Sequence, residues 1–252
     1  MFTPTPLRRA LKASLLNLLA APLSAALNGS KARTAQTANT AKTAKTARIW
    51  GHATLLAGLV AAGAAQAATP AALFKPDLAK GQALSATCQA CHTADGSRGT
   101  PANPILQGQH PEYLVKQLQE FKSGKRKNAI MMGFASMLSD DDMRHVSAFY
   151  ASKKAPPGFA QSKETVSQGE QIWRGGIAAK GVPSCAGCHS PNGAGIPAQN
   201  PRIGGQHAEY TALQLSTFAS GARGNNAQMM TIAGKMSEAE MKAVADFAAG
   251  LR

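Results

Sequence analysis

The chain has 252 residues and a formal net charge of +14, from 27 Lys and Arg against 13 Asp and Glu. The charge is uneven, because residues 1–67 hold eight basic side chains and no acidic one, whereas the remainder carries 19 basic and 13 acidic groups. The remainder is only mildly basic, which argues against nucleic-acid binding and is compatible with docking to acidic surfaces of other proteins.

The amino-terminal segment has the features of an export signal. An apolar run at 53–67 follows a basic stretch that ends at Arg48, and it closes on Ala-Gln-Ala, the small-x-small pattern of a signal-peptidase site. The run is shorter than the roughly 20 residues that a membrane-spanning helix needs. We therefore expect residues 1–67 to be a signal peptide or leader that is removed, with cleavage after Ala67 or, alternatively, after Ala68.

The first 48 residues are unusual for such a signal. They include a low-complexity Thr-Ala-Lys stretch at 40–48, which is not expected to fold, and an apolar patch at 14–27. The simplest interpretation is a misassigned start or a long amino-terminal region of the signal. The alternative is a basic arm that is retained and lies on a membrane surface.

Two copies of the pentapeptide Cys-x-x-Cys-His, at 88–92 and 185–189, contain all four cysteines of the chain. This pattern is the attachment signature of c-type haem. Two intervening residues place both sulfurs on one turn of chain, where they can add to the haem vinyl groups, and the next residue becomes an axial ligand of the iron. A lone copy could be a redox dithiol or half a zinc site, but two copies that use every cysteine predict two covalently attached haem c groups. The predicted attachment residues are Cys88, Cys91, His92, Cys185, Cys188 and His189.

The two motifs belong to an internal duplication. Matching positions share an offset of 97 residues up to Arg126 and Arg223, and an offset of 98 from the Met-Met pairs onward, so the second copy has one extra residue within 222–228. Self-similarity at this period indicates two tandem domains rather than a solenoid. The matches include His110/His207, Tyr113/Tyr210, Gln117/Gln214, Phe121/Phe218, Gly124/Gly221, Ser139/Ser237 and Phe149/Phe247.

Each domain is predicted to be helical, and no convincing period-two strand pattern occurs. In the first domain Leu114, Leu118 and Phe121 recur at helical spacing. Pro111 lies near the predicted start of this helix and Gly124 just after its end.

The last helix of each domain carries a start signal. Ser139 is followed three residues later by Asp142, and Ser237 is followed by Glu240, a spacing typical of a capping box. The expected buried stripes are Met143, Val146 and Phe149 in the first domain and Met241, Val244 and Phe247 in the second.

The predicted fold class is therefore all-α, with domains at 68–155 and 163–252. An Ala-Pro-Pro-Gly sequence breaks any helix between them, which places a linker at 156–162.

Three histidines outside the motifs and the leader could bind a haem iron. His110 and His207 match each other, but each lies only 18 residues after its motif histidine, beside a predicted helix start. We interpret them as hydrogen-bonding residues at helix ends. His145 has no counterpart, because the matching position is Ala243, and it is expected to be a surface or packing residue.

The paired methionines are better candidates for the sixth iron ligand. Met131-Met132 and Met229-Met230 lie about 40 residues after the motif histidines, which leaves enough chain to wrap a haem and present a thioether on its far side. A soft sulfur ligand suits a low-spin iron and raises its potential. Which methionine of each pair binds stays open at this point. The other methionines of the two domains, Met137, Met143, Met236 and Met241, are expected to fill the cores.

The chain resembles the dihaem cytochrome c4 family, which has two class I cytochrome c domains in tandem, each wrapped around one covalently bound haem. The resemblance spans roughly 74–252. It rests on both Cys-x-x-Cys-His motifs, on Gly-Gln-His-x-x-Tyr at 108–113 and 205–210, and on a Met-rich loop before Leu-Ser-Asp at 138–140.

The resemblance also implies individual site residues. In that family the ligating methionine lies eight residues before the serine of the last motif, which corresponds to Met131 and Met229. The family uses a proline carbonyl to accept the ring N–H of the axial histidine, and the matching positions are Pro104 and Pro201. The chain departs from the pattern in its long leader and in Met236, where the first domain has a leucine.

For function, the resemblance implies a periplasmic electron carrier of a bacterium, soluble or loosely membrane-associated, and not an enzyme. Each iron would keep a histidine and a methionine ligand while it changes between ferric and ferrous. The expected partners are redox proteins: a terminal oxidase, a quinol-oxidising complex or a dehydrogenase.

Two alternatives remain open. The first is a dihaem cytochrome subunit of a dehydrogenase, for example of a sulfide-oxidising flavoprotein. The second is a dihaem peroxidase or a thiosulfate-oxidising enzyme, which would need one haem with an open position or with a Cys or Lys ligand. The chain has no spare cysteine and offers the same methionine in both domains, which argues against the second alternative.

Overall fold

The computed structural model describes residues 74–252, so the predicted leader, its cleavage site and the basic arm lie outside the described residues. Within the described range the backbone is helical, and extended pairing is limited to two isolated bridges, Ile177 with Val182 and Ile196 with Asn200. The all-α prediction is confirmed. No helix in this part of the chain is long and apolar enough to cross a bilayer.

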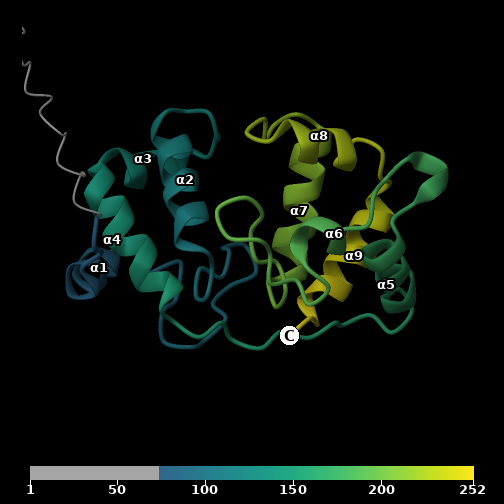
Figure 1. Cartoon of the computed structure of the whole chain (residues 1–252), viewed down its shortest axis with the longest axis horizontal. Helices are drawn as coiled ribbons and strands as arrows, with labels where there is room; N and C mark the ends of the chain where they lie inside the picture. Colours follow the sequence, from purple (N-terminus) through teal and green to yellow (C-terminus); the bar gives the residue numbers. More distant parts are fainter. Residues whose placement is uncertain (1–73) are drawn as a thin grey trace, which may run out of the picture. The chain divides into compact units, whose positions relative to one another are not determined.

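The helices form two groups on either side of a helix-free connection at 152–165 (Figure 1). The groups correspond to the two predicted tandem domains. The first contains α1 Leu78–Ser85, α2 Pro111–Lys122, α3 Ala129–Ser136 and α4 Asp140–Ala151. The second contains α5 Val166–Gly175, the 3-10 turn η1 Ala178–Lys180, α6 Ala186–His189, α7 Ala208–Ala219, α8 Ala227–Ala233 and α9 Glu238–Ala249.

The sequence signals for α2, α4 and α9 are confirmed. Helix α2 begins at Pro111 and is followed by Gly124 at a φ of 76°. At the start of α4 the Ser139 side chain accepts the Asp142 N–H, and the Asp142 carboxylate accepts the Ser139 N–H in return. Helix α9 begins with the same capping box, so each domain ends in a helix whose start is fixed by its own residues.

Helices α1 and α5 were not predicted, and both are defined by tight packing. Helix α1 packs on α4 and α5 packs on α9. A Cβ at Gly81 would collide with the His145 carbonyl, and a Cβ at Gly169 would collide with the Ala243 carbonyl. Glycine therefore lets the first and last helices of each domain approach at backbone distance.

The Met-rich segments, expected to be loops, are the short helices α3 and α8. Asn128 and Asn226 precede them, and their side chains accept the N–H groups of Met131 and Met229 at 3.0 and 2.9 Å. These asparagines are N-caps, which explains why helices start here. The caps also fix the first turn that carries each candidate ligand.

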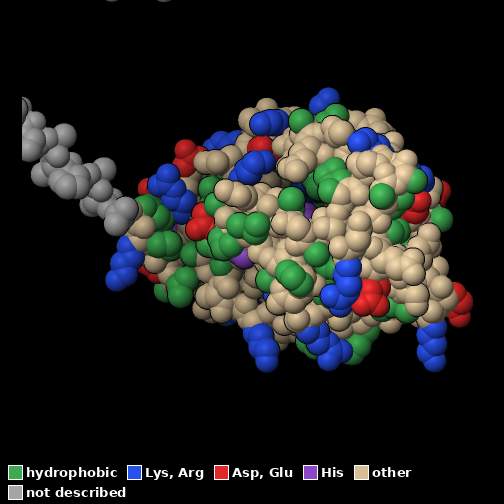
Figure 2. Space-filling view, turned by 45° about the vertical axis from the view of Figure 1, so that its right-hand side comes forward, with side chains coloured by type: hydrophobic (Ala, Val, Ile, Leu, Met, Phe, Trp, Pro, Cys, Tyr) green, Lys and Arg blue, Asp and Glu red, His purple; other side chains and the backbone are tan. Residues whose placement is uncertain are grey.

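Most of the predicted core residues are buried, with one clear exception. Met143, Met236 and Met241 are buried, but Met137 is 69 % exposed, so its assignment to the core was wrong. Met137 lies just past the end of α3, where the fully buried Ala135 occupies the core position of the last turn. The space-filling view in Figure 2 shows Lys and Arg side chains in separate groups on the face it draws, not as one continuous stripe.

The two domains contact each other through matching residues. Arg126 donates to the Tyr210 hydroxyl at 2.9 Å, and Arg223 donates to the Tyr113 hydroxyl at 3.1 Å. The two arginines are buried, and each is related to the other by the duplication. The interface therefore has an approximate two-fold relation. Further bonds of this network run from Arg126 to Gln117 and Gln214 and from Arg223 to Gln117, Gln214 and Asn225.

Candidate functional site

Each Cys-x-x-Cys-His motif forms one helical turn. In the first domain the His92 N–H donates to the Cys88 carbonyl at 2.8 Å, and in the second the His189 N–H donates to the Cys185 carbonyl at 2.9 Å. None of the four cysteines forms a disulfide bond within the described residues, and Cys91 is the most exposed of them. The two cysteines and the histidine of each motif therefore lie on one turn of the backbone.

The motif histidines have the same environment in both domains. Each ring is 8 % exposed. His92 Nδ1 lies 2.8 Å from the Pro104 carbonyl oxygen, and His189 Nδ1 lies 2.9 Å from that of Pro201. Because a carbonyl oxygen only accepts, Nδ1 carries the proton and Nε2 keeps its lone pair. Burial lowers the pKa of both rings, although the proline bonds act in the opposite direction. A neutral imidazole with a free Nε2 is the form that binds a metal.

The two domains fix the backbone near these histidines in different ways. In the first domain the Tyr150 hydroxyl donates to the His92 carbonyl at 2.7 Å, and burial raises the pKa of this phenol. The matching residue of the second domain is Ala248, which has no side-chain donor. There the Trp173 indole donates to the Pro191 carbonyl at 3.1 Å, two residues after the motif histidine.

The candidate methionines lie on α3 and α8. Met131 and Met229 are half-buried, whereas Met132 is 37 % exposed. In the second domain Met229 packs against the hydrophobic cluster that also contacts Cys185. The structure thus places a half-buried thioether at the matching position of both domains.

The donor set fits a covalently attached haem. Burial raises the pKa of Cys88 and raises that of Cys185 to about 11, so neither of these two thiols has the depressed pKa of a redox-active cysteine. Arg202, directly after Pro201, has a buried Nε with no hydrogen-bond partner within the described residues. A carboxylate such as a haem propionate would satisfy this donor.

The other histidines behave as the sequence predicted. His110 and His207 are the residues that precede α2 and α7, and their Nε2 atoms lie 2.9 and 2.8 Å from the carbonyl oxygens of Ala194 and Arg98. They are hydrogen-bonding residues at helix ends, and each one reaches the opposite domain. His145 is a packing residue, whose Nδ1 accepts the Asp77 N–H at 2.9 Å.

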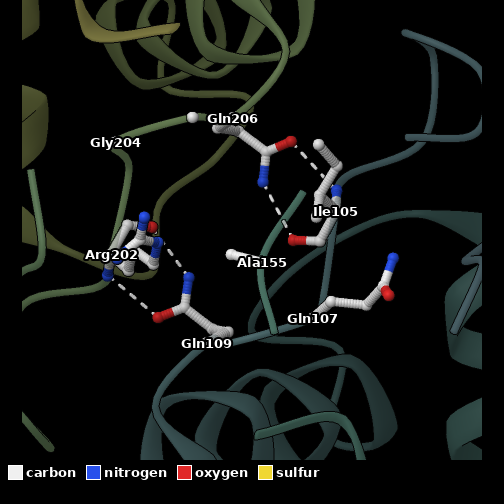
Figure 3. A pocket seen from close by; sticks show the side chains of 8 residues that line it. Ile105, Gln107, Gln109, Ala155, Arg202, Gly204 and Gln206 are labelled. Atoms are coloured by element: carbon white, nitrogen blue, oxygen red, sulfur yellow. Dashed lines mark hydrogen bonds between the residues drawn. The ribbon is translucent and has the colours of Figure 1, made fainter. Parts of the chain in front are cut away.

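Sequence reasoning missed two glutamines, Gln109 and Gln206, which precede these histidines. Their side chains cross the interface and bond the backbone at Arg202 and Ile105, respectively (Figure 3). The repeated Gly-Gln-His sequence contained the signal, because both glutamines are part of the duplicated motif.

Comparisons with known proteins agree with this geometry. The family model described as cytochrome c matches residues 78–154 and 176–251. Cytochrome c4 of Pseudomonas aeruginosa is 44 % identical over 179 residues, which cover 69 % of this chain and 89 % of that protein. A protein of Stutzerimonas stutzeri described as a thiosulfate dehydrogenase electron acceptor is 36 % identical over 169 residues, covering 65 % of this chain and 78 % of that protein.

Solved structures give the same relationship. The crystal structure of reduced recombinant cytochrome c4 from Pseudomonas stutzeri superimposes with a TM-score of 0.67 at 39 % sequence identity. The match covers 71 % of this chain and all of that chain. The described helices therefore share their arrangement with a protein that has both domains.

Proposed function

Since this chain belongs to the dihaem cytochrome c4 family and is a c-type cytochrome that transfers electrons with two covalently attached haem c groups, we propose that one histidine and one methionine bind each iron. Two cysteines of the same motif attach each haem. The proposed residues are Cys88, Cys91, His92 and Met131 in the first domain and Cys185, Cys188, His189 and Met229 in the second.

One repeated observation supports this assignment most strongly. His92 and His189 each direct Nδ1 at a proline carbonyl, that of Pro104 and that of Pro201, and so keep Nε2 for the iron. A hydrogen bond of this kind fixes the ring orientation and makes the imidazole a better donor. Because both domains make it, we infer that both irons have the same ligand set.

In the first domain burial favours Met131, because Met132 is exposed. In the second domain Met230 is half-buried as well, so the choice there rests on the match of Met229 to Met131. The Asn128 and Asn226 caps fix the backbone at these two methionines, and both side chains are half-buried. When bound, each haem supplies a one-electron ferric–ferrous couple. The protein's part would be to keep the same histidine and methionine ligands in both states, so that little rearrangement accompanies electron transfer, and to raise the potential with a thioether.

The test is an optical spectrum and redox titration of protein matured in a bacterial periplasm, with Met131→His and Met229→His as variants. We expect the weak long-wavelength ferric band of a methionine sulfur ligand, positive potentials for both haems, and loss of about half of that band in each variant, with a lowered potential for one haem. A high-spin component in the wild-type protein, or variants that keep the full band, would refute the ligand assignment.

For location and partners, we propose a periplasmic protein exported by a signal peptide within residues 1–67. It would carry electrons from a quinol-oxidising complex or a dehydrogenase to a terminal oxidase. Amino-terminal sequencing of the protein purified from the periplasm would test the first part. A mature chain that begins near residue 68 is expected, and protein retained in the cytoplasm would contradict it.

A second candidate is the role of electron acceptor for a thiosulfate dehydrogenase. The 36 % identity to a Stutzerimonas stutzeri protein with that description supports it. Mixing the oxidised protein with thiosulfate and a thiosulfate dehydrogenase distinguishes the candidates, because reduction of both haems within seconds is expected only of a physiological acceptor.

A further inference from the structure

Gln109 and Gln206 make the same pair of bonds in opposite directions across the interface. The Ile105 N–H donates to Gln206 Oε1 at 2.9 Å, and Gln206 Nε2 donates to the Ile105 carbonyl at 3.0 Å. Reciprocally, the Arg202 N–H donates to Gln109 Oε1 at 2.9 Å, and Gln109 Nε2 donates to the Arg202 carbonyl at 2.8 Å. Both glutamines are buried, and Figure 3 shows the two side chains reaching across the same small pocket.

The peptide group that Gln206 contacts is the same one that bonds the motif histidine of the first domain. The Ile105 N–H and the Pro104 carbonyl belong to one peptide group, and that carbonyl accepts the His92 ring N–H at 2.8 Å. A continuous chain of hydrogen bonds therefore runs from Gln206 of the second domain to the motif histidine of the first.

The reciprocal chain has the same members. Gln109 of the first domain accepts from the Arg202 N–H, whose peptide partner, the Pro201 carbonyl, accepts the His189 ring N–H at 2.9 Å. Each domain thus contributes the outermost acceptor of the chain that ends at the histidine of the other domain.

Hydrogen bonds linked through one peptide group strengthen one another. An acceptor at the N–H withdraws the proton and pushes electron density onto the carbonyl oxygen, and the effect is of the order of 10–30 % per bond. A stronger carbonyl acceptor pulls harder on the Nδ1 proton and makes the imidazole a better donor to the iron. A better donor stabilises the ferric state and lowers the potential.

We propose that Gln206 and Gln109 are positioning residues that tune the haem of the opposite domain through these two chains. The proposal rests on the proposed function, in which His92 and His189 bind the irons. It makes the potential of each haem depend on the docking of the other domain. Loss of a glutamine acceptor should raise the potential of the haem in the other domain and leave that of its own domain unchanged.

This crossed response separates tuning from a purely structural role. A glutamine that only holds the domains together would affect both haems alike when it is removed, because loosening the interface exposes both. A glutamine that acts through its chain affects one haem, and that haem is not the one in its own domain.

The experiment measures the two potentials of the full-length holoprotein separately. A redox titration followed by NMR of the haem methyl protons is suitable, with the signals assigned to domains through the Met131→His and Met229→His variants. The variants of interest are Gln206→Met and Gln109→Met, which keep the side-chain length and remove the hydrogen bonds. For Gln206→Met we expect the reduction equilibrium of the first haem to shift by about threefold toward ferrous. The effect is expected to be small because Gln206 acts one bond further away than the groups that bond a ligating histidine directly, whose loss typically changes metal affinity or activity roughly 10–100-fold.

Two matched controls are available. Gln107→Met removes a glutamine of the same pocket whose bonds, to Gly96, Thr93 and Ser97, stay within its own domain, so the second haem should not respond. Gln206→Glu keeps an oxygen acceptor for the Ile105 N–H, but its negative charge acts on both haems through space. The readout is therefore the difference between the two potentials, which should return toward the wild-type value in Gln206→Glu and not in Gln206→Met.

Three results would overturn the proposal. The first is an unchanged potential of the first haem in Gln206→Met, and the second is an equal shift of both haems. The third is a shift of the first haem's potential in Asn225→Ala that is as large as the shift in Gln206→Met, because Asn225→Ala weakens the interface without touching either chain of hydrogen bonds. The premise is tested apart from these, since a His92→Ala variant that kept a six-coordinate first haem would refute the ligand assignment.

Discussion

The two domains repeat the glutamine and arginine contacts across their interface and the proline contact of each motif histidine, but several of their exposed side chains differ in kind. On α3 and just after it, Ile130 and Met137 are 68 and 69 % exposed, whereas the matching positions on α8 and just after it are Gln228 and Lys235. The segment 122–127, the end of α2 and the loop after it, carries three lysines that the second domain lacks. The pairs are Lys122/Ala219, Lys125/Ala222 and Lys127/Gly224. The repeated hydrogen bonds therefore occur in both copies, whereas these exposed positions carry different kinds of side chain.

Removing the attachment cysteines of one domain is expected to have the largest effect and tests whether the domains mature independently. Cys88→Ala/Cys91→Ala should leave a protein with one covalent haem, and Cys185→Ala/Cys188→Ala should do the same for the other domain. Mass spectrometry of the purified chain measures this directly. Loss of both haems in either variant would show that haem attachment in one domain needs the other domain, so the two domains would not mature independently.

Removing the matching arginines of the interface tests its two-fold relation. Arg126→Ala removes the hydrogen bond to the Tyr210 hydroxyl and Arg223→Ala the one to the Tyr113 hydroxyl, and each variant also removes one charged donor to Gln117 and one to Gln214. We expect each variant to lower the free energy of unfolding by about 2–3 kcal/mol. Urea unfolding followed by circular dichroism provides the values. If one variant loses more than twice as much free energy of unfolding as the other, the two halves of the interface are alike in geometry but not in energy.

Glu120 is the main departure from that relation, because the matching residue is Thr217. Its carboxylate accepts from Asn225 at 2.7 Å and from Lys116 at 2.7 Å. Burial alone would raise the pKa of Glu120, but these two bonds and the positive charges of Lys116 and Lys125 together outweigh it, so the pKa lies below the ordinary value of 4.5. A carboxylate of this kind adds stability above pH 4.5, and the contribution is lost as the pH falls through the lower folded-state value.

Glu120→Gln should therefore lower the free energy of unfolding by about 1–2 kcal/mol at neutral pH. Below pH 4.5 its stability should fall less steeply than that of the wild-type protein. Urea unfolding across this pH range is the measurement, and Glu120→Thr, which copies the second domain, is the control. Parallel pH profiles for the wild-type protein and Glu120→Gln would rule out the depressed pKa.

The capping boxes should show the smallest and most equal effects. Ser139→Ala and Ser237→Ala each remove the side-chain acceptor at the start of a last helix, at a cost of about 1 kcal/mol. Ser→Asp at the same positions keeps an acceptor and should restore most of the loss. A cost confined to one domain would show that its last helix depends on packing rather than on its cap.

Local signals were enough to predict much of this fold. Pro111, Gly124 and the two capping boxes set helix ends through bonds within a few residues of chain, and the spacing of the cysteines sets the motif turn. Helices α1 and α5 were missed because Gly81 and Gly169 act through contact with distant helices, which periodicity does not report. The exposure of Met137 was missed because hydrophobicity alone does not say whether a core position is already filled.

In the candidate site, the contacts within one domain could be expected from the sequence, but the contacts between the domains could not. The histidine environment followed from the resemblance, since both proline contacts are where the aligned positions imply. The roles of Gln109 and Gln206 could not be predicted, because they depend on how one domain docks on the other. The asymmetric pair of Glu120 and Asn225 was hidden for the same reason, although the extra residue within 222–228 marked its place.

The reciprocal contacts also bear on where such a chain comes from. In this interface Arg126 bonds Tyr210, and the matching residues Arg223 and Tyr113 bond each other as well. Such an interface is self-complementary, which is the geometry of a two-fold homodimer. Each domain already holds both partners of the glutamine and arginine contacts. An ancestral single-domain polypeptide could dock on its twin with these contacts, and gene fusion would then make the pair permanent. Only after fusion could one copy acquire Glu120 and the other Asn225, a contact that two identical subunits cannot make just once.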